Sequence, residues 1–450
     1  MLRSWTRFCG STKKLKGEEK QGTLTRASEK EKAMSTIIED IIARKVFNSR
    51  GEETIEVDIV TTSGFGRVSA PAGKSRGKAE VAYYPQGGVE QAIKKVEELV
   101  APEIVGLNAD FQEEIDKTLH EIDGSKDFKI IGGNTAFSIS LANAEAAANS
   151  SGSLLFQYLG GRLANQLPYP IGNVISGGQH TYGKTPDMQE FLVLPHGAGS
   201  FMEAASANVQ IHRRVGEVFK KKNKLFNGGK SDEGAWVASM SDLEALESLS
   251  NACEEVGGEL GFECGLGLDV AASSLWNGKG KSYIYERERK KRNTGEQLDF
   301  ILDLIKKYHL SYVEDAFHEE DYKSFEELAK KAKNCLVCGD DLFTTNNERL
   351  SRGIKMKAAN AIIIKVNQIG TLTEASETVE MATKNGYVPI MAHRSGDSCD
   401  WHIAHLAVAF KCPVIKTGIV EGARIAKINE LVRIEEFLGD RAKMAGLPML

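Results

Sequence analysis

No apolar run in this chain of 450 residues approaches the roughly 18 residues that a membrane-spanning helix requires, so we expect no membrane span. An excess of one charge is also missing, because 57 Lys and Arg stand against 62 Asp and Glu, a formal net charge of −5. Nucleic acid is therefore a poor candidate for a partner, since such binding needs a basic surface.

Cysteine is scarce and irregularly spaced. The seven cysteines are typical of a reduced, intracellular protein, and we expect a cytoplasmic location. Cys335 and Cys338 form a CxxC pair within a predicted strand, where residues three apart face opposite sides. One metal ion could not easily bind both, so we predict a structural role for them.

The composition is that of a soluble globular protein, with 41% hydrophobic and 26% charged residues. Residues 1–34 differ, because they contain nine Lys or Arg and four Glu, a local charge of +5. We predict a disordered basic extension there. An organelle transit peptide is one alternative, and a true start at Met34 is another.

Residues 35–168 combine strand and helix patterns. Ile55, Val57 and Ile59 alternate with polar residues before a turn at Ser63-Gly64, which predicts a hairpin. Helical patterns follow, so this stretch is expected to form a small α+β N-terminal capping domain. The helical patterns cover residues 89–105, 110–122 and 136–150.

Residues 169–450 repeat short apolar runs that alternate with helical patterns. Each run ends in a charged or polar residue, with spacings of 45, 26, 25, 28 and 23 residues. Repeated βα units form an open doubly wound sheet or a closed barrel, and ligands gather at the carboxyl ends of the strands in both. We favour a TIM-like α/β barrel, because it brings all six ends around one centre. The six residues at these ends are Asp269, Glu314, Asp340, Lys365, His393 and Lys416.

Capping boxes are expected to open several of the barrel helices. The pairs are Ser241/Glu244, Thr294/Gln297, Ser324/Glu327 and Thr371/Glu374.

Three predicted strand ends carry carboxylates, namely Asp269, Glu314 and Asp340. They come from consecutive units and should converge, which is unfavourable for like charges without a counter-charge. Hard oxygen ligands in this number suit Mg²⁺. Asp341 is expected on the opposite face of its strand, in a structural role.

The other strand ends are cationic. Lys365, His393 and Lys416, with Arg394 beside them, should face the carboxylates. Such a pocket suits a polyanion with carboxylate and phosphate groups. Neighbouring positive charge should lower the pKa of Lys365, which makes this residue a candidate general base.

A base beside Mg²⁺ suits removal of a proton next to a carboxylate, and the completing acid should lie opposite the base. Candidates are His180 and Glu190 in "GGQHTYGKTPDMQEF" and Glu233 in "GGKSDEGAW". Their Gly-rich settings predict loops, where the backbone can approach a ligand. An ordinary surface loop is the alternative for each stretch.

From about Ile37 to the C-terminus, the chain resembles the enolases (phosphopyruvate hydratases). Two further stretches, "YPQGGVEQA" and "EGAW", resemble archaeal-type enolases. The nine motifs that carry the resemblance are "ARKVFNSRG", "MQEF", "SDEG", "LDVAASS", "VED.F", "GDDL.TTN", "KVNQIG", "HRSGD" and "IKTG".

The resemblance implies a hydro-lyase that reversibly dehydrates 2-phosphoglycerate to phosphoenolpyruvate in glycolysis and gluconeogenesis, with two Mg²⁺ ions per active site. It implies that Lys365 takes the C2 proton and that Glu233, assisted by Glu190, protonates the departing C3 hydroxyl. A homodimer, or an octamer built from dimers, is implied as well. The implied substrate-binding residues are His180, Gln189, His393, Arg394, Ser395 and Lys416. The implied metal ligands are Asp269, Glu314 and Asp340 for the first ion and Ser75, on a mobile loop, for the second.

Several positions depart from the family pattern. "AGKSRG" replaces the usual "SGASTG", so Lys74 and Arg76 add two positive charges to a lid that closes over an anion. "SDEG" and "AHRSGDS" replace "GDEG" and "SHRSGE". The pair of histidines in "HIAH", 402–405, is expected to pack within a helix rather than bind metal.

Two other functions compete with this interpretation. One is another acid–base enzyme of the same superfamily that acts on a different carboxylate, against which the phosphate-suited "HRSGD" argues. The other is a non-catalytic scaffold derived from an enolase. Such a scaffold should have lost Glu233, Lys365 or a carboxylate, and this chain retains them all.

Overall fold

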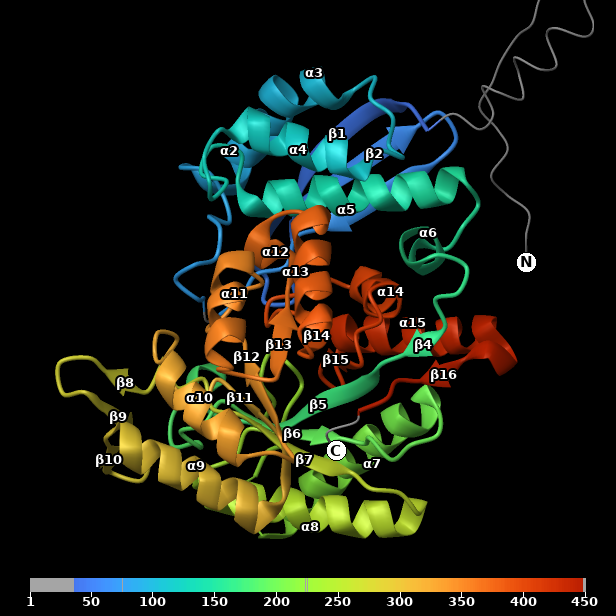
Figure 1. Ribbon diagram of the computed structural model, residues 1–450. Helices are drawn as coiled ribbons and strands as arrows, with labels where there is room; N and C mark the ends of the chain where they lie inside the picture. Colours follow the sequence, from blue (N-terminus) through green and yellow to red (C-terminus); the bar gives the residue numbers. More distant parts are fainter. Residues whose placement is uncertain (1–35, 75, 223, 225, 448–450) are drawn as a thin grey trace, which may run out of the picture.

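The computed structural model describes residues 36–447, apart from residues 75, 223 and 225. A small α+β unit lies over one end of a barrel (Figure 1). This agrees with the predicted fold class, and the eight barrel strands close completely. The predictions for residues 1–34 and for Ser75 fall outside the described residues, and the division of the chain at residue 168 stays a prediction.

The N-terminal unit is an antiparallel sheet in the order β1-β2-β3 with helices on one face. The predicted hairpin is confirmed, since β2 and β3 pair across a turn at residues 62–64. The strands are β1 (Ile38–Phe47), β2 (Glu53–Thr61) and β3 (Phe65–Ser69), and the helices are α2 (Gly88–Lys95), the π-helical turn η1 (Val96–Val100), α3 (Ala101–Ile104), α4 (Gln112–Asp123) and α5 (Gly133–Ser150).

Helix α5 joins the N-terminal unit to the barrel. It contacts β2 and β3 on one side and the barrel helices α12 and α13 on the other (Figure 1). A helix covered on opposite sides needs apolar or small residues all round, which explains its alanine-rich sequence. The packing is close: a Cβ on Gly66 of β3 would lie 2.0 Å from the Ala142 carbonyl oxygen of α5.

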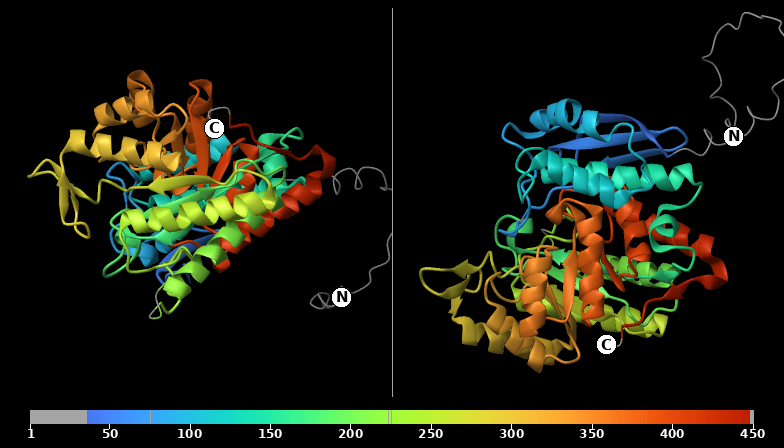
Figure 2. Two further views of the ribbon diagram at one scale, coloured as in Figure 1. Left: turned by 90° about the horizontal axis from the view of Figure 1, so that it is seen from below. Right: turned by 45° about the horizontal axis from the view of Figure 1, so that its top comes forward.

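The barrel strands follow the order β11-β12-β13-β14-β15-β5-β6-β7, with helices packed around them (Figure 2). The six predicted strands are all present, and the sequence interpretation missed β5 and β6. The strands are β5 (Tyr169–Ser176), β6 (Glu190–Leu194), β7 (Gly265–Asp269), β11 (Leu310–Glu314), β12 (Leu336–Gly339), β13 (Ala361–Ile364), β14 (Val388–Ala392) and β15 (Val414–Lys416). The helices are α6 (Leu155–Gly160), α7 (Phe201–Lys222), α8 (Asp242–Leu260), α9 (Thr294–Tyr308), α10 (Tyr322–Lys331), α11 (Asn347–Met356), α12 (Val366–Ile369), α13 (Leu372–Lys384), α14 (His402–Ala409) and α15 (Gly422–Leu438).

Short elements complete the chain. Strands β8, β9 and β10 form a separate small antiparallel sheet that projects from the barrel (Figure 1). These elements are β4 (Gln166–Leu167), η2 (Gly178–His180), β8 (Trp276–Asn277), β9 (Ser282–Tyr285), β10 (Lys290–Arg292), η3 (Gly439–Arg441) and β16 (Lys443–Met444).

Strand β6 is antiparallel to both of its neighbours, whereas the other barrel pairs are parallel. Its first residue, Glu190, therefore pairs with the last residue of β7, Asp269. The start of β6 thus lies at the same rim as the carboxyl ends of the parallel strands. Glu190 is accordingly in a strand, and its prediction as a loop residue was wrong.

The helix caps match the prediction only in part. Ser241 and Glu244 form the expected reciprocal capping box, and the Thr371 hydroxyl accepts from the Glu374 amide. The boxes predicted at Thr294 and Ser324 were wrong, because Asn293 and Asp321 cap those helices instead. Asn and Asp are at least as good N-caps as Ser and Thr, and each stands just upstream of the residue chosen from the pattern.

Of the two cysteines of the CxxC pair, Cys338 lies in β12 and Cys335 directly precedes it, so the prediction that a strand carries both is confirmed only for Cys338. Cys338 packs inside the barrel and Cys335 packs in the outer core. The histidines of "HIAH" also have separate partners, since His402 lies 3.1 Å from Glu145 and His405 lies 2.9 Å from Glu430. Within residues 36–447, no helix combines the length and apolar character needed to cross a bilayer.

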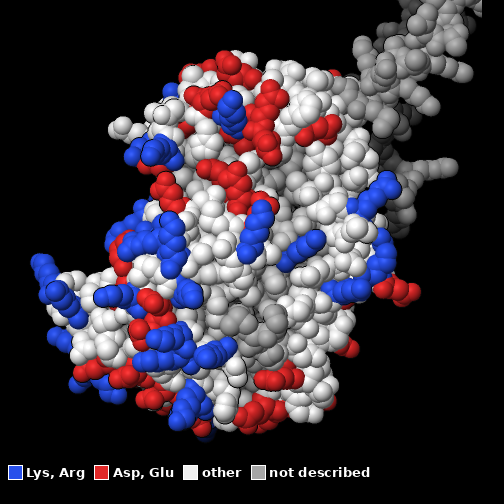
Figure 3. All heavy atoms as spheres, viewed as in Figure 1, with Lys and Arg blue, Asp and Glu red and all other residues white. Residues whose placement is uncertain are grey.

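Charged side chains of both signs cover the face seen in Figure 3. Acidic side chains gather over the N-terminal unit at the top, and basic ones are more frequent over the barrel helices below. The surface charge on this face is therefore mixed and unevenly distributed.

The carboxyl group of Asp242, at the start of α8, makes the stability of the fold depend on pH. The side chain is fully buried, and Oδ1 accepts a hydrogen bond of 3.0 Å from the Met188 amide. Burial raises the pKa of Asp242 from 3.8 to about 7. Between these values the folded state keeps a proton that the unfolded state has lost, so stability falls as pH rises.

Asp242→Asn cannot ionise and should remove this loss. Relative to wild type, its free energy of unfolding should increase by on the order of 4 kcal/mol between about pH 4 and about pH 8. Urea unfolding of both proteins across this range measures the difference. Parallel pH profiles would contradict the assignment.

Candidate active site

The strand register brings the predicted site residues to one rim of the barrel. Glu314 at the end of β11 pairs with Asp269 at the end of β7, which in turn pairs with Glu190. Lys416 ends β15 beside Ala392 of β14, and His393 follows directly. The carboxylates and the cations therefore face one another across the barrel mouth.

Lys416 is the cation at the centre of the acidic group. Its buried Nζ lies 2.7 Å from Glu314 Oε2, 3.0 Å from Glu190 Oε2 and 3.2 Å from Asp269 Oδ2. Burial disfavours the ammonium, but the carboxylates outweigh it and raise the pKa of Lys416 well above its ordinary value. Burial and the charge of Asp269 raise the pKa of Glu314 to about 7. One fixed cation does not neutralise three buried carboxylates.

Lys365, which follows β13, forms a second ion pair. Its Nζ lies 2.5 Å from Asp340 Oδ2, and Gln368 donates a hydrogen bond of 3.1 Å to Asp340 Oδ1. Burial lowers the pKa of Lys365, but Asp340 outweighs this effect and the pKa is raised. The pKa of Lys365 is therefore raised among the protein's own charges because the nearest charge is a carboxylate, and its lowering beside bound metal ions and another lysine stays a prediction.

Asp341 belongs to a cluster with Asp315 and Asp340, whose carboxylate oxygens lie within 4.8 Å of one another. The prediction that Asp341 faces away was wrong, because β12 ends at Gly339 and strand alternation no longer applies. Asp315 was missed. Its two oxygens accept from the amides of Asp340, at 3.0 Å, and Asp341, at 2.8 Å.

His180, Glu190 and Glu233 form a further buried cluster. His180 Nδ1 lies 3.7 Å from Glu190 Oε1 and 3.8 Å from Glu233 Oε2. Burial and the neighbouring Glu233 raise the pKa of Glu190 well above its ordinary value. Burial would also raise that of Glu233, but the surrounding histidines and Arg424 outweigh it and lower its pKa. The raised pKa favours the protonated form of Glu190, and the lowered pKa favours the carboxylate form of Glu233.

Two amides support these acids. Gln189 donates a hydrogen bond of 3.3 Å to Asp269 Oδ2. Asn173 donates one of 3.1 Å to Glu233 Oε2. Asn173 was missed because it lies inside β5, a strand that the sequence pattern did not reveal.

Arg394 is held by the N-terminal unit. Its NH2 group donates to both oxygens of Glu80, at 3.0 and 3.1 Å, and to the Tyr83 hydroxyl at 2.7 Å. Ser395 Oγ likewise accepts from the Lys74 amide, at 2.8 Å, and from Arg50 at 2.9 Å. The N-terminal unit therefore completes the cationic side of the site.

The two cations that distinguish the segment around residue 75 rest on aromatic rings. The Lys74 ammonium lies 5.0 Å from the ring centre of Tyr182, and the Arg76 guanidinium lies 3.7 Å from that of Tyr83. Such contacts stabilise a cation over a ring face. They tie this segment to the loop that carries His180 and to the tyrosine that holds Arg394.

The acids at the rim fit a divalent cation. Glu314 Oε1 is buried without a hydrogen-bond partner among the described residues, and three carboxylates supply hard oxygen donors. Two groups have ligand atoms within 4.8 Å of one another and could bind a metal ion, namely Asp315, Asp340 and Asp341, and His180, Glu190 and Glu233. Among the described residues, Asp269, Glu314 and Asp340 do not together form such a group. The space enclosed by the site is about 30 Å³, room for about one water molecule, because the lysines pair directly with the carboxylates.

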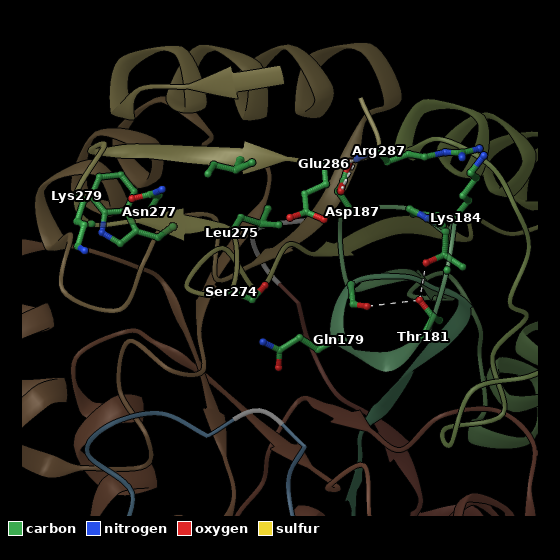
Figure 4. A pocket seen from close by; sticks show the side chains of 17 residues that line it. Gln179, Thr181, Lys184, Asp187, Ser274, Leu275, Asn277, Lys279, Glu286 and Arg287 are labelled. Carbon is green, nitrogen blue, oxygen red and sulfur yellow. Dashed lines mark hydrogen bonds between the residues drawn. The ribbon is translucent and has the colours of Figure 1, made fainter. Parts of the chain in front are cut away.

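A larger groove of about 990 Å³ lies outside this site (Figure 4). One wall is the loop that follows His180, and the other includes residues 274–279 and 284–287. The Asp187 carboxylate accepts from the Arg287 amide across the groove, at 3.0 and 3.1 Å. None of the three rim carboxylates lines the groove, so it is not the centre of the chemistry.

A closed α/β barrel whose mouth sets buried lysines against carboxylates, beneath a small α+β unit, is the architecture of an acid–base enzyme. Two family models match the chain: "Enolase, N-terminal domain" over residues 38–159 and "Enolase, C-terminal TIM barrel domain" over residues 164–450. The chain belongs to the enolase family, whose members are lyases.

Curated relatives agree, and they are mostly archaeal, as the sequence motifs predicted. An enolase of Methanosphaera stadtmanae is 51% identical over 406 residues, which cover 90% of this chain and 98% of the relative. One from Methanothermobacter thermautotrophicus is 49% identical over 92% of this chain and 100% of the relative. One from Pyrobaculum aerophilum is 49% identical over 89% of this chain and 97% of the relative.

Proposed function

We propose that the protein catalyses the reversible, Mg²⁺-dependent dehydration of 2-phosphoglycerate to phosphoenolpyruvate in glycolysis and gluconeogenesis. The observation that carries this proposal is one pocket at the barrel rim that Lys365, Glu233 and Glu190 all line. Removal of a proton from C2 and loss of hydroxide from C3 need a base and an acid on opposite sides of the substrate.

In this proposal Lys365 takes the C2 proton, and the Glu233–Glu190 pair delivers a proton to the C3 hydroxyl. The pair is suited to this task because both carboxyl groups are buried beside His180 and the raised pKa of Glu190 favours its protonated form. Lys365 must lose its own proton first, and its contact with Asp340 opposes that loss.

Two Mg²⁺ ions are part of the proposal. Asp269, Glu314 and Asp340 would hold the first ion and Ser75 the second. When bound, the ions supply positive charge that stabilises the dianion formed on loss of the C2 proton. With an ion bound to Asp340, this carboxylate would stabilise the ammonium form of Lys365 less, which favours the neutral amine.

The remaining residues would bind and orient the substrate. Arg394 and Ser395 suit the phosphate group because a guanidinium and a hydroxyl offer several donors to its oxygens. Lys416 would face the substrate carboxylate, with His180, Gln189 and His393 around the reacting carbons. We also propose that the protein forms a homodimer, or an octamer built from dimers, and is located in the cytoplasm.

The test is formation of phosphoenolpyruvate from 2-phosphoglycerate, followed by the ultraviolet absorbance of the conjugated product. We expect activity with Mg²⁺, none after chelation, and recovery when Mg²⁺ is restored. Full-length protein and protein that begins at Met34 should be equally active if residues 1–33 are dispensable. Metal-independent activity, or inactivity with folded and metal-loaded protein, would exclude the proposal.

A further inference from the structure

Arg424 is a fully buried cation that the proposed chemistry does not use. It lies in the first turn of α15, and its side chain is 0% exposed. A buried guanidinium is costly unless its donors are paired, so its partners indicate what it does. Four of its contacts lead to segments that carry site residues.

One guanidinium nitrogen, NH1, donates 2.8 Å to His393 Nδ1 and 2.7 Å to the Arg394 carbonyl. The other, NH2, donates 2.5 Å to the Ser395 carbonyl and 3.0 Å to the Asp232 carbonyl. The planar guanidinium therefore joins the segment after β14 to the loop that carries Glu233. Asp232 and His393 are 161 residues apart in the sequence, and their two segments meet at the Arg424 side chain.

The contact with His393 fixes the proton on that ring. Arg424 has donors only, so His393 Nδ1 must be the acceptor and cannot carry a proton. The ring proton is then on Nε2, which lies 3.7 Å from Glu233 Oε1. The neighbouring guanidinium and the burial of His393 also lower the pKa of the ring well below its ordinary value.

We propose that Arg424 is a positioning residue that holds His393 as the neutral Nε2–H tautomer, with its donor directed at Glu233, and that clamps the Glu233 loop to the segment 393–395. The proposal rests on the proposed function and deepens it. It names Arg424 as the group that orients His393 toward Glu233, the proposed acid. The Nε2–H group of His393 then directs its positive end toward the Glu233 carboxylate, 3.7 Å away.

Nitrogen NMR of the full-length protein with isotopically labelled histidine reads the tautomer directly. The His393 signal among the nine histidines is assigned by its loss in His393→Gln. We expect an unprotonated Nδ1 and a protonated Nε2 in the metal-loaded wild-type protein. A protonated Nδ1, or a charged ring, would overturn the proposal without the need for any variant of Arg424.

Arg424→Lys and Arg424→Met test the positioning role. Lysine keeps the charge but offers a point donor rather than a fork, so it should restore only part of the function lost with methionine. We expect kcat to fall roughly 10–100-fold in Arg424→Met, with a mixture of His393 tautomers in its NMR spectrum. Unchanged kcat and tautomer in a folded Arg424→Met protein would refute the assignment.

Lys427→Met is the matched control. Lys427 is a second buried cation one turn along α15, and it pairs with Asp397 at 3.0 Å and with the Ser398 carbonyl at 2.7 Å. Its loss should lower stability without altering the His393 spectrum. Because the tautomer is read without substrate, a protein inactive on 2-phosphoglycerate that shows the expected signal would refute the proposed function and leave the role of Arg424 intact.

Discussion

Lys365→Ala is expected to abolish turnover while it leaves metal and substrate binding largely intact. Among the residues that line the pocket, Lys365 is the only one whose amine contacts Asp340. Loss of a positioned general base costs roughly 10²–10⁴-fold in rate. The loss should be in kcat, measured by product absorbance, with metal and substrate affinities measured by calorimetry.

Two further variants separate proton transfer from charge. Lys365→Arg retains a cation beside Asp340, but a guanidinium does not act as a base near neutral pH, so it should be as inactive as Lys365→Ala. Lys384→Ala removes a lysine whose side chain is 68% exposed on α13 and should leave turnover unchanged. Near-normal turnover in Lys365→Ala would refute the assignment of the base.

The rim of the site could be predicted from the sequence because six of the parallel barrel strands end in a predicted site residue or are directly followed by one. The apolar run 361–364 followed by Lys365 is the clearest case, since β13 ends at Ile364 and the lysine follows at the rim. The register then brings the ends of neighbouring strands together. Repetition with a regular spacing, rather than any single residue, carried this prediction.

Antiparallel and distant contacts could not be predicted in this way. Glu190 starts a strand rather than ending one, so it broke the rule that located the other acids. Glu80 pairs with Arg394 from 314 residues away, and Arg424 contacts His393 from a helix with no strand-end signal. Periodicity reports local structure and which face is buried, whereas these pairs depend on the closed three-dimensional fold.

The contact between Lys365 and Asp340 could not be predicted for a related reason. The sequence indicated which cations and carboxylates share the rim, but not which of them touch. At 2.5 Å, the Asp340 carboxylate outweighs more distant cations, because the Coulomb energy falls with distance and is weakly screened in a buried site.

Glu233→Gln should separate the two halves of the proposed reaction. If Lys365 removes the C2 proton before the C3 hydroxyl leaves, the variant should still exchange the C2 proton with solvent. Formation of phosphoenolpyruvate should fall by roughly 10²–10⁴-fold, because the departing hydroxyl lacks its proton donor. Mass spectrometry of 2-phosphoglycerate incubated in deuterated water measures exchange, and product absorbance measures elimination.

Glu190→Gln should behave in the same way, because glutamine imitates the protonated carboxyl but cannot give the proton to Glu233. Glu436→Gln, an exposed substitution on α15, is the matched control and should retain both activities. Lys365→Ala must lose exchange as well as elimination. If Glu233→Gln lost exchange while still binding metal and substrate, proton removal would depend on Glu233, and a separate base and acid on opposite sides of the pocket would be untenable.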